Sequence, residues 1–484
     1  MTWLILIQIL YGLLVFLVIA KVLYDTRSGT KALAYILFIV LVPVVGMVFY
    51  FSFGINYRKK VLYDRKMVDD EVLLQKIINK VRNYSQEVAD SHLMNKQYRG
   101  LAKLIYNVGN SPLTANNKVE LLRNGEEKFP KVLEALRNAK SSIHLEYYIY
   151  ENDTTGNQIV DVLIEKAKEG IEVRFMYDDF GSHGLKNNII KRLTENGVQT
   201  APFYKIKLYA FANRINYRNH RKIIVIDGLT SFVGGINISD KYRNDLDNGN
   251  KLFWRDTHLM LQGPATFYLQ YTFLCDWNYC SNQKLIFDPK YFPTPENQQE
   301  IEGEIVQIVS SGPDSDLPLI YYSLIDALAS AKKQICITSP YFIPSESLVD
   351  ALIMACEKGI KVKILVPGIS DSKMVNAAAR AYYTEILQHG AQIYLYNKGF
   401  VHAKTMVVDE DLAIIGSANM DYRSFDLNFE VNAMVYSSKI ARQLLVAFED
   451  DLSFSAKIDA KAWLARPKRF HLWEKLVRLL SPFL

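Results

Sequence analysis

Two long apolar runs open the chain. Residues 1–20 contain no charged side chain, and residues 32–57 form a second uncharged run that includes Pro43 and Gly46. Twenty helical residues span about 30 Å, which is the thickness of the hydrocarbon core of a bilayer. Pro and Gly are tolerated in membrane helices when neighbouring groups satisfy the backbone. The pattern therefore predicts a two-helix transmembrane hairpin over residues 1–57.

A cleaved signal peptide is the alternative interpretation of the first run, but that run lacks a basic N-terminal region and an A-x-A cleavage site.

Cations flank the second run unequally. Lys21, Arg27 and Lys31 precede it, and Arg58, Lys59, Lys60, Arg65 and Lys66 follow it. Because cytoplasmic segments carry the excess of Lys and Arg, we expect a multi-pass protein of the cell membrane whose C-terminal body faces the cytoplasm.

Short apolar strands then alternate with amphipathic helices. After a polar connector over residues 58–117, strand-like segments occupy residues 142–150 and 171–177, and again residues 334–342 and 360–366. This alternation predicts an α/β fold with a largely parallel sheet. The glycines that end the intervening helices, Gly170 and Gly359, lie 189 residues apart, which indicates a duplication. Because βα units resemble one another, the pattern alone leaves a chance similarity open.

A repeated motif makes the duplication specific. Residues 219–227 read NHRKIIVID and residues 401–409 read VHAKTMVVD; GGIN follows at 234–237 and GSAN at 416–419. Both copies fit H-x-K-(x)4-D-(x)6-G-[GS]-x-N. A single H-x-K arises easily by chance, whereas two long copies with identical spacing do not. We predict two equivalent mixed-sheet halves related by a pseudo-twofold axis, over residues 118–300 and 301–460.

The motif carries chemistry suited to a phosphodiester. With a strand period of two, His220 and Lys222 share one strand face, as do His402 and Lys404. Lysine ammoniums, backbone N–H groups of the Gly-rich turns and neutral side-chain donors would surround one anion. The neutral donors are Asn237, Ser417 and Asn419. Two histidines whose pKa values are pushed apart could supply a neutral nucleophile and a protonated acid. No clustered set of metal ligands is apparent, so we expect neither a metal nor another cofactor.

The duplicated motif resembles that of the phospholipase D superfamily, and the surrounding residues are similar to those of bacterial cardiolipin synthases. The matching segments extend over nearly the whole chain and comprise PVVG at 43–46, LEYYI at 145–149, RNHRK at 218–222, WRDTH at 254–258 and SPYFIP at 339–344. The resemblance implies that His220 attacks phosphorus and His402 protonates the departing alkoxide. It also implies that Lys222 and Lys404 bind phosphoryl oxygens, and that Asp227 and Asp409 complete the catalytic motif as positioning groups.

Members of this superfamily also carry, after each motif, a carboxylate that hydrogen-bonds a catalytic histidine. Glu430, 21 positions after Asp409, fits that place in the second half. The same offset in the first half falls on Asn248, so Asp256 is the better candidate there. Surface or helix-capping carboxylates are the alternative for both, because exposed Asp and Glu are common.

The resemblance implies cardiolipin synthesis in a bacterial cell membrane, in which a phosphatidyl group passes from one phosphatidylglycerol to another through a phosphohistidine and releases glycerol. A membrane-anchored hydrolase, or a transferase with another acceptor or a donor such as phosphatidylethanolamine, is the alternative. A nuclease would need a basic, aromatic groove, and the membrane anchor argues against nucleic acid as a partner. Intact His and Lys in both motifs argue against an inactive scaffold. The sequence leaves the oligomeric state open.

The chain ends in a basic amphipathic segment over residues 461–484. Its apolar residues at helical spacing are Leu472, Trp473, Leu476, Leu479, Leu480 and Phe483, and the cations off that stripe are Lys468, Arg469, Lys475 and Arg478. We expect an interfacial helix for anionic lipid, with packing of the helix on the body as the alternative.

Composition changes this picture only slightly. The net charge of +6 over 484 residues argues against a protein that coats nucleic acid with its whole surface. The two basic ends together carry more positive charge than the chain as a whole, so the body between them is mildly acidic. The 4 cysteines form no CxxC pair and favour reduced thiols over disulfides.

Overall fold

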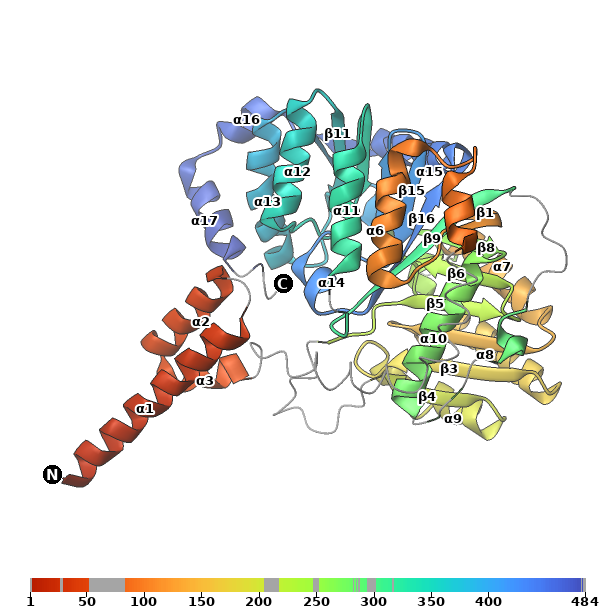
Figure 1. Ribbon diagram of the computed structural model, residues 1–484, viewed down its shortest axis with the longest axis horizontal. Helices are drawn as coiled ribbons and strands as arrows, with labels where there is room; N and C mark the ends of the chain where they lie inside the picture. Colours follow the sequence, from red (N-terminus) through yellow and green to blue (C-terminus); the bar gives the residue numbers. More distant parts are fainter. Residues whose placement is uncertain are drawn as a thin grey trace.

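Figure 1 shows a broad body of strands and helices, with a helical N-terminal segment that projects from one end. The computed structural model describes residues 2–26, 29–51, 83–203, 217–246, 252–281, 283, 285, 288–293, 302–315, 317–479 and 481. Within these residues, the body is built on one 15-stranded sheet, accompanied by a separate two-stranded pairing.

The strands fall into two sets along the chain. The first set is β1 (Thr114–Arg123), β2 (Ser142–Tyr147), β3 (Glu172–Asp178), β4 (Gln199–Phe203), β5 (Lys222–Ile226), β6 (Thr230–Gly234), β7 (Phe253–Arg255) and β8 (Thr257–Gln262). The second is β9 (Glu304–Ser311), β10 (Gln334–Thr338), β11 (Lys361–Pro367), β12 (Gln392–Tyr396), β13 (Gly399–Val401), β14 (Thr405–Val408), β15 (Leu412–Gly416), β16 (Glu430–Tyr436) and β17 (Ser455–Lys457). All the strand segments predicted from the sequence are present, within a few residues at each end.

The sheet has the same order on both sides of its centre. Outward from the central β9–β1 pair, one side runs β1, β8, β6, β5, β2, β3, β4 and the other runs β9, β16, β15, β14, β10, β11, β12. Strands β2, β3 and β4 pair in parallel, as do β10, β11 and β12, while the inner strands pair antiparallel. The expectation of a largely parallel sheet is therefore wrong and that of a mixed sheet is confirmed, because tight turns rather than helical crossovers join β5 to β6 and β14 to β15.

Helices cover both faces of this sheet. They are α6 (Arg99–Gly109), α7 (Asn124–Arg137), α8 (Thr154–Lys168), α9 (Ile189–Glu195), α10 (Ala265–Ser281), α11 (Leu319–Ser330), α12 (Glu346–Glu357), α13 (Lys373–Gln388), α14 (Tyr422–Asp426) and α15 (Ser438–Ser453). The last two helices, α16 (Ala460–Leu464) and α17 (Lys468–Arg478), pack on α13 instead. Single 3₁₀ turns occur at Lys96–Tyr98, His183–Leu185, Asp240–Tyr242 and Pro289–Tyr291.

Neighbouring strand residues enter different hydrophobic cores. Ile224 packs in a core with α7, α8 and α9, whereas Ile223 packs in a core with α10. Likewise Met406 packs with α11, α12 and α13, whereas Val407 packs with α15. The core that holds Ile223 also holds Val407, so both halves of the chain share it. This shared core fixes the loops at the centre of the sheet relative to one another.

The N-terminal segment differs from the predicted hairpin. Among the described helices, α1 (Thr2–Asp25) alone is long and apolar enough to cross a membrane. The second apolar run is divided into α2 (Gly29–Leu41) and α3 (Pro43–Phe49). At about 1.5 Å per residue they are about 20 and 10 Å long, so neither spans a hydrocarbon core by itself. The prediction of one continuous second helix is wrong, and residues 52–57 of that prediction lie outside the described residues.

Pro43 and Gly46 account for this division. Pro43 cannot donate a backbone hydrogen bond, and the chain turns at Val42, whose φ of −137° and ψ of 72° are not helical. Helix α3 then folds back onto α2, as the 5.4 Å distance between the rings of Tyr35 and Tyr50 shows. A Cβ at Gly46 would lie 2.7 Å from the backbone of Ile39, so glycine permits the close contact between the two helices.

The connector and the C-terminus are described in part. Within the predicted connector, residues 83–90 and α6 are helical, and β1 begins at Thr114, inside the predicted connector. The predicted final helix is divided at Pro467 into α16 and α17. In Figure 1, α17 lies at the same end of the molecule as α1, α2 and α3.

Candidate active site

Each half of the chain presents one motif histidine beside an inner strand of the sheet. His220 precedes β5, which begins at Lys222, and His402 precedes β14, which begins one residue after Lys404. Both histidines are 8% exposed, and both lysines are buried. The buried strands predicted at residues 223–226 and 405–408 are confirmed.

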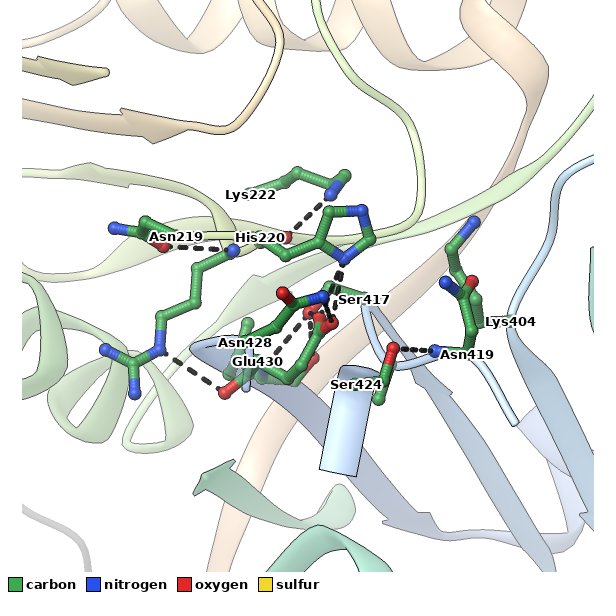
Figure 2. Close-up of polar contacts among 12 residues, drawn as sticks. Asn219, His220, Lys222, Lys404, Ser417, Asn419, Ser424, Asn428 and Glu430 are labelled. Carbon is green, nitrogen blue, oxygen red and sulfur yellow. Dashed lines mark hydrogen bonds and ion pairs between the residues drawn. The ribbon is translucent and has the colours of Figure 1, made fainter. Parts of the chain in front are cut away.

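The two histidines are paired crosswise with carboxylates of the opposite half. Nδ1 of His220 lies 2.9 Å from both carboxylate oxygens of Glu430, which begins β16 (Figure 2). Nδ1 of His402 lies 2.7 Å from Oδ2 of Asp256, which directly precedes β8. Glu430 and Asp256 are therefore histidine partners, as expected, but each serves the histidine that the other half supplies.

Backbone hydrogen bonds hold this crosswise arrangement. The His220 N–H donates to the Phe429 carbonyl at 2.9 Å, and the His402 N–H donates to the Arg255 carbonyl at 2.7 Å. Phe429 and Arg255 immediately precede Glu430 and Asp256, so the two contacts are equivalent. The parallel pairing of β7 with β13 extends the second contact. Each imidazole thus has its position fixed against its carboxylate by main-chain contacts from the other half.

Both carboxylates are held as anions in a buried setting. Ser417 Oγ donates to Glu430 Oε2, and Asn428 Nδ2 donates to Glu430 Oε1 at 3.1 Å. At the motif position equivalent to Ser417, a Cβ on Gly235 would lie only 2.2 Å from Asp256 Oδ1. Burial alone would raise the pKa of both carboxyls, but His220 lowers the pKa of Glu430, and Lys404 with His402 lowers that of Asp256.

The lysines fold back toward the histidines. Lys222 Nζ donates to the His220 carbonyl at 2.6 Å. Lys404 Nζ donates to the His402 carbonyl and lies 3.0 Å from both ring nitrogens of His402. Burial lowers the pKa of Lys222 to about 7 and that of Lys404 to about 8, although nearby carboxylates oppose the change. Both ammoniums are therefore poorly solvated and suited to bind an anion.

The histidine pKa values differ from the expectation that they are pushed apart. Burial, together with the neighbouring ammoniums, lowers the pKa of His220 to about 4 and that of His402 to about 3. Desolvation acts alike on both rings and outweighs the stabilisation of the imidazolium form by Glu430 and Asp256, so both histidine pKa values fall. A phosphodiester anion bound beside the lysines would raise both values, because it favours the imidazolium form.

Asp227 and Asp409 do not reach the site, contrary to the expectation that they complete the catalytic motif. Each lies at the far end of its strand; Asp227 comes five positions after Lys222, which along a strand is about 17 Å. The Asp227 carboxylate accepts backbone N–H groups of residues 140–142, and that of Asp409 accepts those of residues 332–334. Both have a φ of 54°. They close the turn before β2 and β10, a structural task that motif spacing alone could not distinguish from catalysis.

The two motif asparagines have different surroundings. Asn237 accepts a hydrogen bond from the Ile149 N–H at 3.3 Å and donates one to the Tyr242 hydroxyl at 2.8 Å. Asn237 therefore holds together segments that line the site. The buried Oδ1 of Asn419 has no hydrogen-bond partner among the described residues. Asn419 is thus the better placed of the two to contact a substrate, while Ser417 serves Glu430.

Aromatic side chains that the sequence reasoning did not single out surround both histidines. The Tyr148 ring lies 4.9 Å from His220, and the Tyr242 and Trp254 rings lie 5.9 and 5.5 Å from His402. These rings exclude water and contribute to the burial that lowers the histidine pKa values. Tyr148 and Trp254 occur in segments quoted above for the resemblance, but spacing alone gave them no role.

The described part of the chain contains no cluster of side chains suited to a metal ion. No group of three or more His, Cys, Asp or Glu side chains there is arranged to hold a metal ion. The groups around the two histidines are instead ammoniums, carboxylates and amides.

Comparisons with known proteins agree with this geometry. A family model described as "Cardiolipin synthase, PLD-like domain" matches residues 132–267 and 324–452, one match in each half. The chain is also 39% identical to the major cardiolipin synthase of Bacillus subtilis, over 99% of each chain. The chain belongs to the cardiolipin synthase family of the phospholipase D superfamily.

Other cardiolipin synthases are similarly related. That of Alkalihalophilus pseudofirmus is 40% identical over 99% of this chain and 94% of its own, and that of Geobacillus kaustophilus is 41% identical over 95% and 90%. A "Phospholipase_D-nuclease N-terminal" model matches residues 13–54, which include α2 and α3. In fold, the chain resembles a phosphatidylserine synthase from Haemophilus influenzae with a TM-score of 0.58 and 16% identity, over 80% of this chain and all of that one.

Proposed function

We propose that the protein is a cardiolipin synthase that transfers a phosphatidyl group from one phosphatidylglycerol to a second, giving cardiolipin and glycerol. The observation that carries this proposal is the crosswise pairing of His220 with Glu430 and of His402 with Asp256, beside two buried lysines. Two oriented imidazoles and two ammoniums suit a double displacement at one phosphorus atom.

In the first displacement, Nε2 of His220 attacks the phosphorus of phosphatidylglycerol. Glu430 accepts a hydrogen bond from Nδ1–H of His220, which keeps the proton on Nδ1 and leaves the Nε2 lone pair free. The bond between phosphorus and the headgroup glycerol oxygen breaks, and protonated His402 gives its proton to that oxygen. Lys222 and Lys404 bind the non-bridging oxygens, and the product is a phosphatidyl-histidine.

In the second displacement, His402 accepts the proton from a glycerol hydroxyl of another phosphatidylglycerol. That oxygen attacks phosphorus, the bond between phosphorus and nitrogen breaks, and cardiolipin leaves. The phosphodiester that forms replaces the one that broke, so the exchange needs no nucleotide. If water takes the place of the second lipid, the same steps give phosphatidic acid.

The architecture supports a duplicated origin for this site. We infer two phospholipase D-like halves related by a pseudo-twofold axis, because the strand order is the same outward from β1 and from β9. The equivalent backbone contacts of His220 and His402, and the equal φ of Asp227 and Asp409, support the same inference. In such a pair, one half supplies the nucleophile and the other the acid.

The membrane position that fits best puts the body on the cytoplasmic face. If α3 returns to the side from which α2 entered, as their close packing favours, α1 is the one span among the described helices. All the cations from Lys21 to Lys66 then lie on the side of the body, in agreement with the excess of cations on the cytoplasmic side. A second full span would place three of them on the opposite face. A single span therefore replaces the multi-pass expectation.

The deciding experiment incubates the purified protein with phosphatidylglycerol as the sole lipid and resolves the products. Cardiolipin and glycerol in equal amounts are expected. Phosphatidic acid in place of cardiolipin would support a hydrolase, and absence of any product would support a scaffold. Adding phosphatidylethanolamine as a second lipid tests an alternative donor, since ethanolamine release would then accompany cardiolipin.

A further inference from the structure

Helix α17 is attached to the body by one face only. Glu474 and Val477 are 4% and 3% exposed. Glu474 accepts a bidentate pair of hydrogen bonds from Arg466 at 2.9 Å and another from Arg380 of α13 at 3.0 Å. On the same side, the Arg478 guanidinium lies 4.3 Å from the Tyr382 ring centroid. These buried contacts fix how the helix is rotated about its axis.

That rotation turns the apolar stripe outward. Leu472, Trp473, Leu476 and Leu479 are 62%, 60%, 51% and 72% exposed. At 3.6 residues per turn, Leu472, Leu476 and Leu479 lie on the side of the helix opposite Glu474, and Trp473 lies on the flank, about 100° from Glu474. These four members of the stripe predicted from the sequence therefore do not pack on the body, and its last two members, residues 480 and 483, lie outside the described residues. Four large apolar side chains in one exposed strip are typical of an interaction surface rather than of scattered surface residues.

The charges beside this strip select its partner. Lys468, Arg469 and Lys475 are exposed, and Lys468 and Lys475 form no ion pair with a residue in the described ranges. An apolar strip that carries a tryptophan and is flanked by cations matches the boundary between headgroups and acyl chains of an anionic bilayer. In Figure 1, α17 lies at the end of the molecule that carries α1, α2 and α3.

We propose that the Leu472–Trp473–Leu476–Leu479 face of α17 binds the interface of an anionic bilayer. This second attachment goes beyond the proposed reaction and does not depend on it. Together with α1, it would limit how the body can tilt relative to the membrane. The site between the two halves would then keep one orientation toward the lipid headgroups.

The test uses the full-length chain reconstituted in vesicles of phosphatidylglycerol brominated near the top of the acyl chains. A Trp3→Phe background removes the tryptophan of α1, which reaches the bilayer in any case. The fluorescence of Trp473 is obtained by subtraction, as the difference between the Trp3→Phe chain and the Trp3→Phe/Trp473→Phe chain. We expect bromine to quench this signal at least twofold and aqueous iodide to leave it unchanged. Quenching by iodide and not by bromine would overturn the proposal.

Trp463 is the matched control because it lies one helix earlier and is 8% exposed, packed against Tyr383. Its signal, obtained with Trp463→Phe, should be quenched by neither agent. The Leu472→Glu/Leu476→Glu variant should lose the bromine quenching of Trp473 while its thermal unfolding is unchanged, because both residues are exposed. Val446→Glu, at a 60% exposed position of α15, should leave that quenching intact.

A second copy of the chain is the other occupant that this strip could accept. Sedimentation of the parent and of Leu472→Glu/Leu476→Glu in detergent separates the two partners. A concentration-dependent dimer that the substitutions abolish, with Trp473 unquenched by bromine, would refute lipid binding. Equal sedimentation of the two chains, with bromine quenching only in the parent, supports it.

Discussion

At the residue scale, the proposed mechanism assigns a different step to each of the two histidines, although their crosswise contacts are equivalent. A histidine that protonates a poor leaving group becomes dispensable when the leaving group needs no proton, whereas a nucleophile does not. With the 4-nitrophenyl ester of phosphatidic acid, His402→Ala and Asp256→Asn should release about one nitrophenolate per site and then stall. His220→Ala should give no burst, and Glu430→Gln a much slower one.

Phosphatidylglycerol is the matched substrate for this comparison, because its alkoxide leaving group needs protonation. On that lipid, each of the four substitutions should slow transfer by roughly 10²- to 10⁴-fold. When His402→Ala protein is quenched after reaction with the 4-nitrophenyl ester, mass spectrometry should find the phosphatidyl group on His220. A nitrophenolate burst from His220→Ala together with none from His402→Ala would reverse the assignment of the two roles.

Asp227 and Asp409 should matter for stability and not for chemistry. Each carboxylate accepts three consecutive backbone N–H groups, so Asp227→Asn or Asp409→Asn should cost about 1–3 kcal/mol of unfolding free energy. Asparagine tolerates the φ of 54° at both positions, whereas alanine adds strain, so the Ala variants should unfold at lower temperature than the Asn variants. Thermal unfolding measures this order, and transfer activity per folded molecule should equal that of the parent.

The residues of the site were predictable to the extent that local spacing determines them. The period of two brought His220 beside Lys222, and the resemblance, with the offset along the chain that it implies, pointed to Glu430. The crosswise partnership was not predictable, because His220 and Glu430 are 210 residues apart and meet only through packing of the two halves. The role of Asp227 was misread since a motif does not reveal which of its members lie at the far end of a strand.

At the scale of elements, the folded-back α2–α3 pair can be tested by cross-linking. In a continuous helix, residues 35 and 50 would lie about 22 Å apart, but the Tyr35 and Tyr50 rings lie 5.4 Å apart. A Tyr35→Cys/Tyr50→Cys chain in membranes should be joined by a short bismaleimide. Adding Gly46→Leu should reduce that joining at least fivefold, because a side chain there would collide with the backbone of Ile39.

The matching control is Gly12→Leu in α1, where a Cβ would meet nothing within 4 Å, and cross-linking should be unchanged. A tag placed before α1 should also be digested by protease added outside intact spheroplasts, because a single span places it opposite the body. Protection of the tag, with no cross-link, would restore the two-span hairpin. The break itself was missed in the sequence because Pro43 is compatible with either a kinked span or a turn.

Element patterns were otherwise informative for strands and poor for topology. The apolar segments at residues 142–150 and 360–366 became β2 and β11, and both are parallel to a neighbour as predicted. The antiparallel inner strands followed from the short turns at Asp227 and Asp409, which alternation of helices and strands does not reveal. Pairing of β1 with β9 depends on contacts between halves and lies beyond any local pattern.

At the scale of the whole molecule, one active site requires both halves to be folded. His220 and His402 each contact a carboxylate and a carbonyl group from the opposite half, and the two halves share one hydrophobic core. Burial of both imidazoles therefore reports the assembly of the entire body. Loss of the interface would expose both rings to water and restore their ordinary proton affinity.

This coupling predicts how the stability of the body depends on pH. Unfolded histidine titrates near pH 6.5, whereas burial lowers the pKa of folded His220 to about 4 and of His402 to about 3. Between pH 6.5 and about 4, these two histidines bind protons in the unfolded chain but stay neutral in the folded chain, so the free energy of unfolding falls as pH falls. At pH 5 the loss is about 2 kcal/mol for each histidine. His220→Gln and His402→Gln should therefore flatten the decline in unfolding temperature between pH 7.5 and 5, whereas His183→Gln, at an exposed histidine, should not. Parallel curves for all four chains would show that the site histidines are not desolvated in the folded protein.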